Sequence, residues 1–465
     1  MRERAGRILR DLAEAVRGSE QDYTQGAIGR AILLLSVPMV LEMAMESVFA
    51  VVDVYFVAHI GPSAVATIGL TESILTLIYA VALGLSIGTT AMVSRRIGEK
   101  NPEEAANTAV QAILVGVLMS IPIALVGIFF ARDAMRLMGG DEWVIREGFR
   151  YTRWMLGGNV VIMLLFILNA VFRGAGDAAI AMRVLWLSNG INIVLGPTLI
   201  RGWGPFPEMG VEGAGIATTI GRGTGVLMQF IVLFRGARHI RVLRSHLRAR
   251  TELMWRLVRV SLGGIGQFVI SMSSWIGLVR IMSVFGSDAL AGLTIAFRIA
   301  TFTFLPAYGL SNAAATLVGQ NLGAKQPERA ERSVWLTGMA TMAFMAVVAA
   351  VYIIWNEPLV RIFTDDPRVI RVGADCLRII SYGYLFYAWE LVGLQAFNGA
   401  GDTGTPTRIN FVCFYLVQIP LAYLLAMHTP AREHGVYWSV VIAESLAGVI
   451  AIMLFRRGRW KTRMV

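Results

Sequence analysis

The sequence predicts an all-α polytopic membrane protein with twelve transmembrane helices, arranged as two parallel six-helix repeats. Three observations predict this fold. Of the 465 residues, 56% are hydrophobic and only 16% are charged, whereas a soluble domain carries about 25% charged residues. Apolar runs of about 20 residues, the length that crosses a bilayer, recur along the whole chain. The second half of the chain also repeats the first at a fixed offset.

The apolar runs define the predicted helices to within a few residues. We expect spans at about residues 31–58, 64–91, 106–131, 151–172, 179–200, 211–234, 257–284, 289–318, 334–355, 376–397, 407–427 and 436–455. Proline and glycine interrupt several of them, as in many transporter helices. A β-barrel would need segments of about ten residues that alternate in polarity, and no long alternation is present.

Lysine and arginine near the span ends predict the orientation, because cytoplasmic loops carry the excess of these residues. With the N-terminus inside, the inside segments hold about 28 of them and the outside segments about 11, while Arg222, Arg280 and Arg298 fall within spans. We therefore expect a cytoplasmic (inner) membrane protein with both termini cytoplasmic. The net charge of +11 then reflects topology and attraction to anionic lipids. No basic face with interleaved aromatic residues is present, so nucleic acid is not an expected partner.

Residues 1–22 lack the apolar core of a signal peptide and predict a cytoplasmic or interfacial helix.

The chain repeats itself at an offset of 225 residues. The segment Phe172–Asp177 (FRGAGD) recurs as Phe397–Asp402 (FNGAGD), and the loop Val93–Ala105 recurs as Val318–Ala330 with six of thirteen positions identical. Each half carries six spans, so both insert in the same orientation, and parallel repeats of this kind hold the substrate between them. A channel could also arise by duplication, but no filter-like loop or ring of charges is visible. The predicted organisation is an N-terminal arm (1–27), an N-lobe (28–234), a cytoplasmic linker (235–256), a C-lobe (257–455) and a basic cytoplasmic tail (456–465).

Three carboxylates lie within the first span, where each costs roughly 2.5–3.5 kcal/mol on insertion scales. At about 100° per residue, Glu46 lies about 40° and Asp53 about 20° from Glu42 around the helix. The three therefore share one face, which must contact water or polar protein, and the N-lobe becomes the predicted coupling lobe. Each carboxylate can exchange a proton or ligate Na⁺. The alternative interpretation is that one or two of them pair with the intramembrane arginines and only hold helices together.

Other side chains within the spans are candidates for a substrate cavity. Methionine and aromatic side chains adapt to varied apolar substrates, and polar groups would orient them. The predicted cavity residues are Asn169, Met43, Phe49, Met163, Gln267, Met272 and Glu390. For the amides, hydrogen bonding between helices is the alternative interpretation, and for the apolar residues it is packing in the core or against lipid.

Motifs of enzymes and metal sites suggest no other function. Residues 84–88 (GLSIG) match the hydrolase pattern G-x-S-x-G and residues 399–404 (GAGDTG) match G-x-G-x-x-G, but neither follows a strand. The five histidines show no metal-ligand spacing, and Cys376 and Cys413 are too few for a disulfide framework. No ATP-binding P-loop is present. We expect no enzymatic activity, no metal centre and no cofactor, and an ion gradient as the energy source.

The chain resembles the MATE (multidrug and toxic compound extrusion) family over about residues 28–455. The resemblance rests on Leu35–Pro38 (LSVP) followed by Asp53, on the Gly61-Pro62 turn, on Val93–Gly98 (VSRRIG) and on the paired F-x-G-A-G-D segments. It implies a V-shaped fold of two six-helix lobes about a central cavity. It also implies efflux of amphipathic, often cationic compounds in exchange for H⁺ or Na⁺.

The DinF-type branch of the family is the most similar and implies ion-coupling residues. In that branch an aspartate on the first helix couples transport to the ion, beside an asparagine on helix five and a threonine on helix six. Asp53, Asn192 and Thr218 match these positions, and they would also be the ligands if the ion is Na⁺. Glu46 and Glu42 are further carboxylates for the same role.

Two departures from the family patterns bear on the coupling ion. Gly196 stands where the DinF-type branch has a second aspartate on helix five, which favours H⁺ over Na⁺. Ser271 stands where the NorM-type branch has a glutamate on helix seven, and Glu390 lies only near the position of that branch's helix-ten aspartate. Coupling through the C-lobe is therefore not expected.

The resulting hypothesis is a secondary active antiporter that exports amphipathic or cationic drugs or metabolites in exchange for H⁺, or Na⁺. Its expected partners are small-molecule substrates and membrane lipids, without nucleic acid, and it is expected to act as a monomer. Two alternatives stay open. A lipid-linked precursor flippase of the same superfamily would have more spans and a strongly cationic cavity. A membrane-embedded enzyme would need a catalytic dyad, which the sequence does not display.

Overall fold

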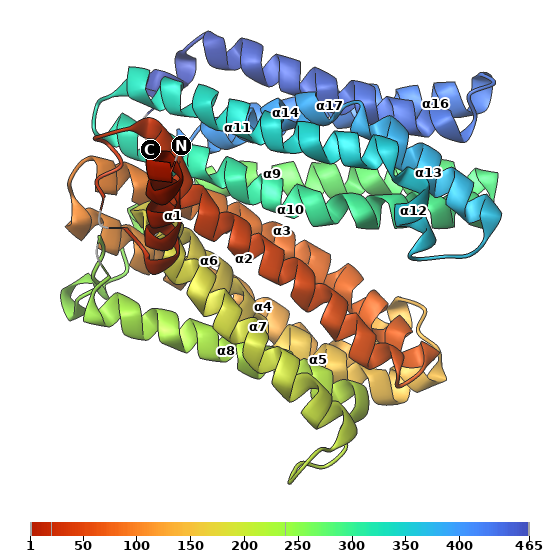
Figure 1. The fold of residues 1–465 in the computed structure, drawn as a ribbon. Helices are drawn as coiled ribbons and strands as arrows, with labels where there is room; N and C mark the ends of the chain where they lie inside the picture. The colour runs from red at the N-terminus through yellow and green to blue at the C-terminus, as the bar shows by residue number, and fades with distance from the viewer. Residues whose placement is uncertain (1, 20, 238, 464–465) are drawn as a thin grey trace.

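The computed structural model describes residues 2–19, 21–237 and 239–463, without the side chains of residues 2–5, 7–8, 50–51, 53–54 and 58 (Figure 1). All regular secondary structure in this part of the chain is helical. Eleven of its helical segments are long and apolar enough to cross a membrane. The twelfth crossing, predicted at 376–397, consists of two consecutive helices, α13 (Pro367–Ser381) and α14 (Tyr384–Gly399), each shorter than a membrane span.

The N-lobe contains the first six crossings, which run alternately in opposite directions. They are α2 (Ile28–Ala58), α3 (Pro62–Gly98), α4 (Pro102–Leu137), a composite crossing of η1 (Val144–Gly148), α5 (Phe149–Gly157) and α6 (Asn159–Ala175), then α7 (Ala178–Arg201) and α8 (Gly210–Arg235). Residues 236–250, with the short η2 (Arg244–His246), lead to the C-lobe.

The C-lobe repeats this plan. Its elements are α9 (Thr251–Met282) with η3 (Ser283–Phe285), α10 (Ser287–Gly323), α11 (Pro327–Ile354), α12 (Asn356–Arg361), α13 and α14, a composite crossing of α15 (Gly404–Asn410), η4 (Phe411–Gln418) and α16 (Ile419–His428), and α17 (Glu433–Arg456), followed by η5 (Arg459–Thr462). Helix α9 begins at Thr251, before the predicted lobe boundary at 257.

The segments expected as the loops Val93–Ala105 and Val318–Ala330 are mostly helix. In the first, α3 continues to Gly98 and α4 begins at Pro102. The turn between them is short because Asn101 caps α4 by accepting a hydrogen bond from the Glu104 N–H, and a proline fits the first helical turn. Apolar runs underestimate these helices, because their ends extend beyond the apolar core of a membrane as polar turns.

The 225-residue repeat is visible in the backbone as matching turns. Residues with positive φ recur at the same offset, in the pairs Gly61 and Gly286, Lys100 and Lys325, and Gly176 and Gly401. The composite crossings break at matching positions, at Gly158 before α6 and at Gly383 before α14. The fold is therefore two parallel six-helix repeats.

Both chain ends lie at the same end of the molecule, which we call the terminal end (Figure 1). The lobes approach closely in the halves of α2, α3, α9 and α10 nearest to it, where glycine brings one backbone against another. The contacts are Gly84 with Ile265, Gly309 with Met39 and Gly98 with Gln320. Away from the terminal end the lobes diverge, which gives the V shape (Figure 1).

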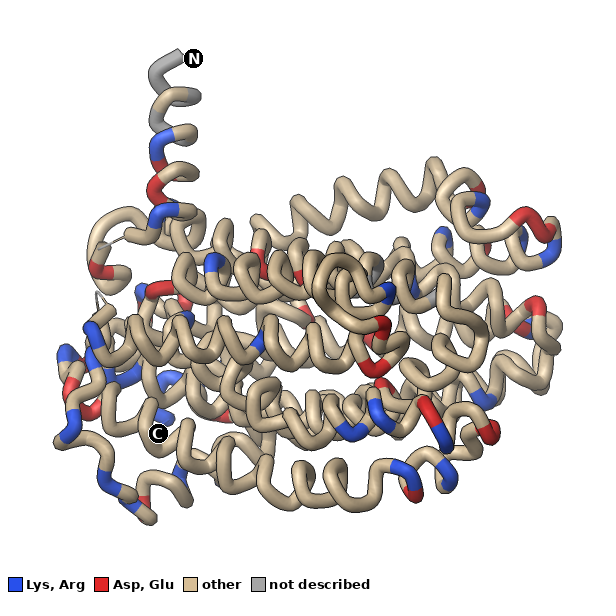
Figure 2. The backbone as a smooth tube through the Cα atoms, turned by 90° about the horizontal axis from the view of Figure 1, so that it is seen from below, with Lys and Arg blue, Asp and Glu red and all other residues tan. Residues whose placement is uncertain are grey.

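Polar contacts at the terminal end also join the two lobes. Arg329 of α11 donates hydrogen bonds to the carbonyl oxygens of Gln25 and Gly26, just before α2. Within the N-terminal half, Lys100 of the turn between α3 and α4 pairs with Asp22 of the arm before α2. Burial raises the pKa of Asp22, but hydrogen bonds from Lys100 and Thr24 outweigh it, so the pKa lies below its ordinary value. Helix α1 (Arg2–Arg17) protrudes beyond the bundle at this end, and lysine and arginine gather toward both ends of the bundle (Figure 2).

Candidate functional site

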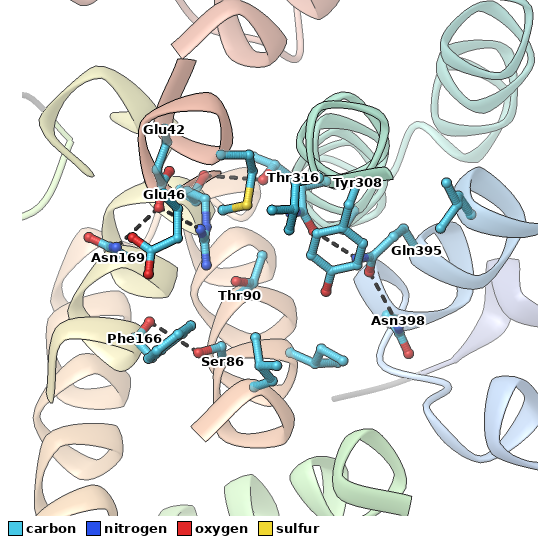
Figure 3. Close-up of a pocket in the computed structure, with 18 of the residues that line it drawn as sticks. Glu42, Glu46, Ser86, Thr90, Phe166, Asn169, Tyr308, Thr316, Gln395 and Asn398 are labelled. Atoms are coloured by element: carbon cyan, nitrogen blue, oxygen red, sulfur yellow. Dashed lines mark hydrogen bonds and ion pairs between the residues drawn. The ribbon is translucent and has the colours of Figure 1, made fainter. Parts of the chain in front are cut away.

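A cavity of about 370 Å³ lies between the lobes (Figure 3). Its N-lobe wall combines apolar residues, such as Met43 and Phe166, with a group of charged and amide side chains: Glu42, Glu46, Asn169, Arg173 and Arg222. Aromatic and neutral polar side chains form its C-lobe wall: Phe268, Phe304, Tyr308, Asn312, Gln395 and Asn398. Figure 3 shows Glu42 and Asn169 on the opposite side of this space from Tyr308 and Gln395. The volume lies within the range of small-molecule sites.

Glu42 is held by an ion pair on the N-lobe wall. Arg173 Nη1 lies 3.0 Å from Glu42 Oε1, and Asn169 Nδ2 donates to the same oxygen at 3.1 Å. Gln229 of α8 donates to Asn169 Oδ1 and so orients that amide. Among the described residues, Glu42 Oε2 is buried without a hydrogen-bond partner. The site therefore keeps one unused acceptor on a carboxylate that is 1% exposed.

Glu46, one helical turn further along α2, forms a second and looser ion pair. Arg222 Nη2 lies 3.4 Å from Glu46 Oε1, and Asn189 Nδ2 donates to Oε2 at 3.2 Å. Arg222 also donates to the hydroxyl of Tyr79 at 3.2 Å. The Glu46 side chain is 31% exposed, so a solute in the cavity can reach it.

The charges on this wall are balanced by two arginines, of which the sequence analysis placed only Arg222 within a span. The pairing interpretation holds for Glu46, whose partner is the intramembrane Arg222. Glu42 pairs instead with Arg173, which the predicted span 151–172 leaves outside the membrane. Because α6 continues to Ala175, Arg173 remains within the helix and reaches the cavity.

The C-lobe carries a neutral copy of the Glu42–Arg173 pair. At the repeat offset of 225, Glu42 corresponds to Gln267 and Arg173 to Asn398. Gln267 Nε2 donates to Asn398 Oδ1 at 3.0 Å, and Asn398 Nδ2 donates to Gln267 Oε1 at 3.2 Å. The same geometry thus holds an ion pair in one lobe and an amide pair in the other.

The predicted ion-coupling residues fall on α2, α7 and α8. Asn192 Nδ2 donates to Thr218 Oγ1 at 2.9 Å, and both side chains are buried. Asp53 belongs to α2, but its side chain lies outside the described residues.

The backbone still gives the level of Asp53 along the helix. Helices α2 and α7 run in the same direction, and Trp186 and Asn189 of α7 bond to Leu41 and Glu46 of α2. The register of the Asn189–Glu46 contact, continued along both helices, brings Asp53 level with Gly196. A Cβ atom at Gly196 would lie 3.6 Å from Asn192 Oδ1, so Gly196 leaves room beside the Asn192 amide.

A second cavity, of about 300 Å³, enters the C-lobe and shares residues such as Tyr308 and Asn398 with the first. Gln267 and Ser271 line it, as do Glu390 of α14 and Glu444 of α17. The two carboxyl groups lie close enough to interact with each other. Glu390, predicted for the substrate cavity, thus lies in this second cavity.

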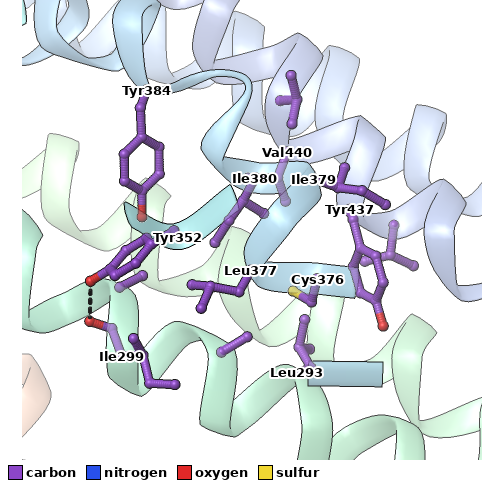
Figure 4. Packing of buried hydrophobic residues seen from close by; sticks show 14 of the residues in the cluster. Leu293, Ile299, Tyr352, Cys376, Leu377, Ile379, Ile380, Tyr384, Tyr437 and Val440 are labelled. Carbon is purple, nitrogen blue, oxygen red and sulfur yellow. Dashed lines mark hydrogen bonds between the residues drawn. The ribbon is translucent and has the colours of Figure 1, made fainter. Parts of the chain in front are cut away.

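Next to this cavity the C-lobe is a densely packed apolar core (Figure 4). The hydroxyl of Tyr352 donates to the carbonyl oxygen of Ile299 at 3.0 Å, and its ring packs edge-on against Tyr384; Leu377 and Cys376 belong to the same core. Cys376 and Cys413 are both buried free thiols. The cavity is therefore bounded by rigid packing on this side.

Three predicted cavity residues line neither cavity. Met163 is fully buried in the N-lobe core, and Phe49 is buried with its ring 5.9 Å from the Arg222 guanidinium. Met272 is 41% exposed and belongs to the lining of neither cavity. The sequence does not distinguish an apolar side chain that faces a cavity from one that faces the protein core or the lipid. Met43 and Asn169, in contrast, line the central cavity.

Sequence reasoning missed Arg173, Tyr308, Asn312 and Gln395 on the cavity wall. The F-x-G-A-G-D repeat held a signal for the first, because its second position, Arg173 or Asn398, lines the cavity in both lobes. Gln395 donates to Asn312 Oδ1 at 2.7 Å, and both are amides within spans, like the selected Asn169 and Gln267. In the described residues, no cluster of three or more His, Cys, Asp and Glu side chains is placed to bind a metal ion.

Comparison with known proteins identifies the family. The MatE family model matches residues 38–198 and 264–424, once in each lobe. The chain is 27% identical over 447 residues to the "Probable multidrug resistance protein NorM" of Thermotoga maritima, which covers 94% of each chain. It is 23% identical to the FAD transporter of Shewanella oneidensis, over 92% of this chain and 95% of that one. A crystal structure of MATE in complex with MaL6 has a TM-score of 0.87 at 24% identity, over 94% of this chain and 97% of that chain.

These matches agree with the fold. The model matches more than half of the chain, and its two matches coincide with the two structural repeats. The relatives are multidrug resistance proteins and transporters, which supports export of drugs or metabolites by a multi-pass membrane protein that is not an enzyme. The chain belongs to the MATE family of multidrug and toxic compound extrusion transporters.

Proposed function

We propose that this protein is a secondary active antiporter that exports amphipathic, often cationic, drugs or metabolites in exchange for H⁺. The observation that carries the proposal is the asymmetry between the lobes. The N-lobe wall of the central cavity holds the ionisable pairs of Glu42 and Glu46, whereas the C-lobe has the amide pair of Gln267 and Asn398 at the positions equivalent to Glu42 and Arg173. Coupling to an ion requires groups that change charge, so the N-lobe is the proposed coupling lobe.

The wall opposite these pairs suits amphipathic substrates. Phe268, Phe304 and Tyr308 present ring surface toward the cavity, and aromatic faces attract organic cations. The multidrug resistance and FAD transporter names of the relatives support a small organic molecule. A strongly cationic cavity, as expected for a flippase of lipid-linked precursors, is not favoured by two arginines that are each paired with a glutamate.

The contacts between the lobes support alternating access. The close backbone approaches lie near the terminal end, so a rocking of one lobe against the other would open this end and close the divergent one. We propose that both termini are cytoplasmic in the inner membrane, on the distribution of lysine and arginine. The central cavity would then face outward here. One chain builds both walls of the cavity, which supports function as a monomer.

Ion coupling is assigned to Asp53, with Glu46 and Glu42 as its partners. The Asn192–Thr218 pair and Asp53 would supply ligands for Na⁺, but Gly196, level with Asp53, contributes no carboxylate. This favours a proton as the coupling ion. A proton on Glu46 would release Arg222 and remove the charge that attracts a cationic substrate. Proton and substrate would therefore favour different states of the cavity, as antiport requires.

The test is transport of ethidium or norfloxacin by the purified protein in liposomes. An imposed pH gradient is compared with an imposed Na⁺ gradient, in the parent protein and in Asp53→Asn. The matched control is Asp133→Asn, at an exposed aspartate whose side chain is 61% accessible. We expect transport driven by the pH gradient in the parent and the control, and at least a tenfold loss in Asp53→Asn.

Other outcomes would each change the assignment. Transport driven by Na⁺ alone would mean that Gly196 does not prevent a cation site. If Asp53→Asn transports like the parent and Glu390→Gln does not, coupling belongs to the Glu390–Glu444 pair of the C-lobe. The absence of transport for both probes in the parent would contradict the proposed substrate class and favour the flippase.

A further inference from the structure

A separate cavity, of about 710 Å³, lies at the terminal end of the C-lobe. It is bounded by the start of α15 and η4, the end of α17 and the tail that contains η5. Four arginines line it, namely Arg408, Arg457, Arg459 and Arg463. Five apolar side chains also line it, namely Phe397, Ile409, Val412, Ile450 and Leu454. It shares no lining residue with the central cavity.

The arginines leave unbalanced positive charge in this cavity. Asp402 pairs with Arg463 at 3.2 Å and also accepts a hydrogen bond from Thr405 at 2.8 Å. Within the part of the chain that the structure describes, Arg408, Arg457 and Arg459 form no ion pair. A ligand of this cavity should therefore carry negative charge.

The apolar residues lie deeper along the same helices. Val412 follows Arg408 by about one turn. Leu454 and Ile450 of α17 precede Arg457, the residue after the helix, by about one and two turns. Val412 is 40% exposed, and the neighbouring Leu416 and Met453 are 60% and 53% exposed. An apolar surface thus continues from the arginines toward the membrane interior, where an acyl chain would lie.

The structural repeat supplies an independent comparison. At the offset of 225, Arg408 corresponds to Arg183 and Asp402 to Asp177. In the N-lobe, both Nε and Nη2 of Arg183 donate to the carbonyl oxygen of Val16 in α1, at 3.2 and 2.9 Å. No described segment supplies such an oxygen to Arg408. An oxygen ligand from outside the chain would complete the C-lobe site.

We propose that this cavity binds one anionic phospholipid, with its phosphate among Arg408, Arg457 and Arg459 and an acyl chain along Val412, Ile450 and Leu454. Basic pockets between membrane helices recognise acidic lipid headgroups in this way. The layered order of charge and apolar surface favours a lipid over a free anion. The proposal does not depend on the transport mechanism, because the cavity is separate from the central one.

The experiment is a lipid titration of the detergent-purified protein, followed by native mass spectrometry. Phosphatidylglycerol is compared with phosphatidylcholine in the parent and in Arg408→Gln/Arg457→Gln/Arg459→Gln. The control, Arg241→Gln/Arg244→Gln/Arg248→Gln, removes the same charge from the exposed linker. We expect one phosphatidylglycerol bound in preference to phosphatidylcholine. Since each arginine near a headgroup contributes about a fivefold change in affinity, the cavity variant should lose on the order of a hundredfold and the control little.

A second variant separates the lipid from free phosphate. Val412→Trp fills the apolar part of the cavity and keeps every arginine. It should weaken phosphatidylglycerol binding, and millimolar inorganic phosphate should not displace the lipid from the parent. Equal losses in the cavity and linker variants would overturn the proposal, because binding would then follow net charge alone. Displacement by phosphate together with unchanged binding by Val412→Trp would assign the site to a free anion instead.

Discussion

At the scale of single residues, the buried pair of Glu42 and Arg173 can be compared with the equivalent amide pair of Gln267 and Asn398 in the other lobe. An ion pair in a poorly hydrated wall stabilises a fold only while both partners are present. The amide pair makes the same connection between helices without charge. An ion pair kept where a neutral pair makes the same connection is expected of a group that serves function.

This comparison predicts the stability of two variants. Glu42→Gln leaves the guanidinium of Arg173 without its counter-charge and should destabilise the fold by about 3 kcal/mol, since a broken buried pair costs about 3–5 kcal/mol and Arg173 reaches the cavity. Glu42→Gln/Arg173→Asn recreates the C-lobe pair and should recover most of that loss. The measurement is thermal unfolding in detergent, followed by tryptophan fluorescence. A double variant that melts no higher than Glu42→Gln would show that the two sites are not equivalent.

At the scale of helices, glycine sets how closely α3 can approach the C-lobe. A Cβ atom at Gly84 would lie 2.5 Å from the backbone nitrogen of Ile265 and 2.9 Å from its Cα atom. These are backbone atoms of α9, so a whole helix must shift to make room. A Cβ atom at Gly69, in the same helix, meets nothing within 4 Å.

We therefore expect Gly84→Ala to hinder closure of the terminal end and to lower transport at least tenfold. Gly69→Ala should leave transport unchanged, because alanine favours helix by about 1 kcal/mol and meets open space there. Transport in liposomes measures both. Equal activity of the two variants would mean that the observed approach of α3 and α9 is not needed in the transport cycle.

The helices themselves were predictable from the sequence, and their partners were not. Hydropathy identified each crossing because a span is a local property, and the repeat identified the two lobes. The sequence analysis did not predict the break before Tyr384, because Tyr382 and Gly383 lie inside an apolar run. It also did not predict the pairing of Glu42 with Arg173, because this pairing depends on α6 reaching Ala175 and packing against α2.

The same limit separates the candidate site into two groups. Glu42, Glu46 and Asn169 were found because a polar group within a membrane span is costly and needs a reason. Met163 and Met272 were predicted to line the cavity, but the structure places Met163 in the core and Met272 on an exposed face. Sequence alone does not separate these cases, because burying methionine in protein or in lipid satisfies the same apolar preference. The face that a helix turns to its neighbours decides such cases, and it depends on the tertiary structure.

At the scale of the whole molecule, residues 22–26 contact Lys100 and Arg329 at the terminal end, and we call these polar contacts the clasp. Because the pKa of Asp22 lies below its ordinary value, its pair with Lys100 contributes fully above that ordinary value and is lost only as the pH falls through the lowered pKa. The pair is therefore constant between about pH 6 and 8. Asp22 and Lys100 both belong to the N-terminal half, so this pair fastens the segment before α2 to the N-lobe throughout that range, while Arg329 joins the same segment to the C-lobe.

Arg329 is the part of the clasp that a single substitution can open. Its guanidinium donates to Gly26 O at 2.9 Å, Gln25 O at 2.8 Å and Tyr23 O at 3.3 Å, and hydrogen bonds from a charged group contribute about 1.5–3 kcal/mol each at most sites. Arg329→Gln should therefore shift the protein toward a state that is open at the terminal end and closed at the other. Spin labels at the exposed positions Glu142 and Asp365, one on each lobe far from the terminal end, should then move closer together in pulsed electron resonance.

The control variant Arg332→Gln removes the same charge from an exposed position of α11 and should leave the distance between the labels unchanged. If Arg329→Gln also leaves it unchanged, the glycine contacts alone hold the lobes together, and the clasp follows their closure without causing it.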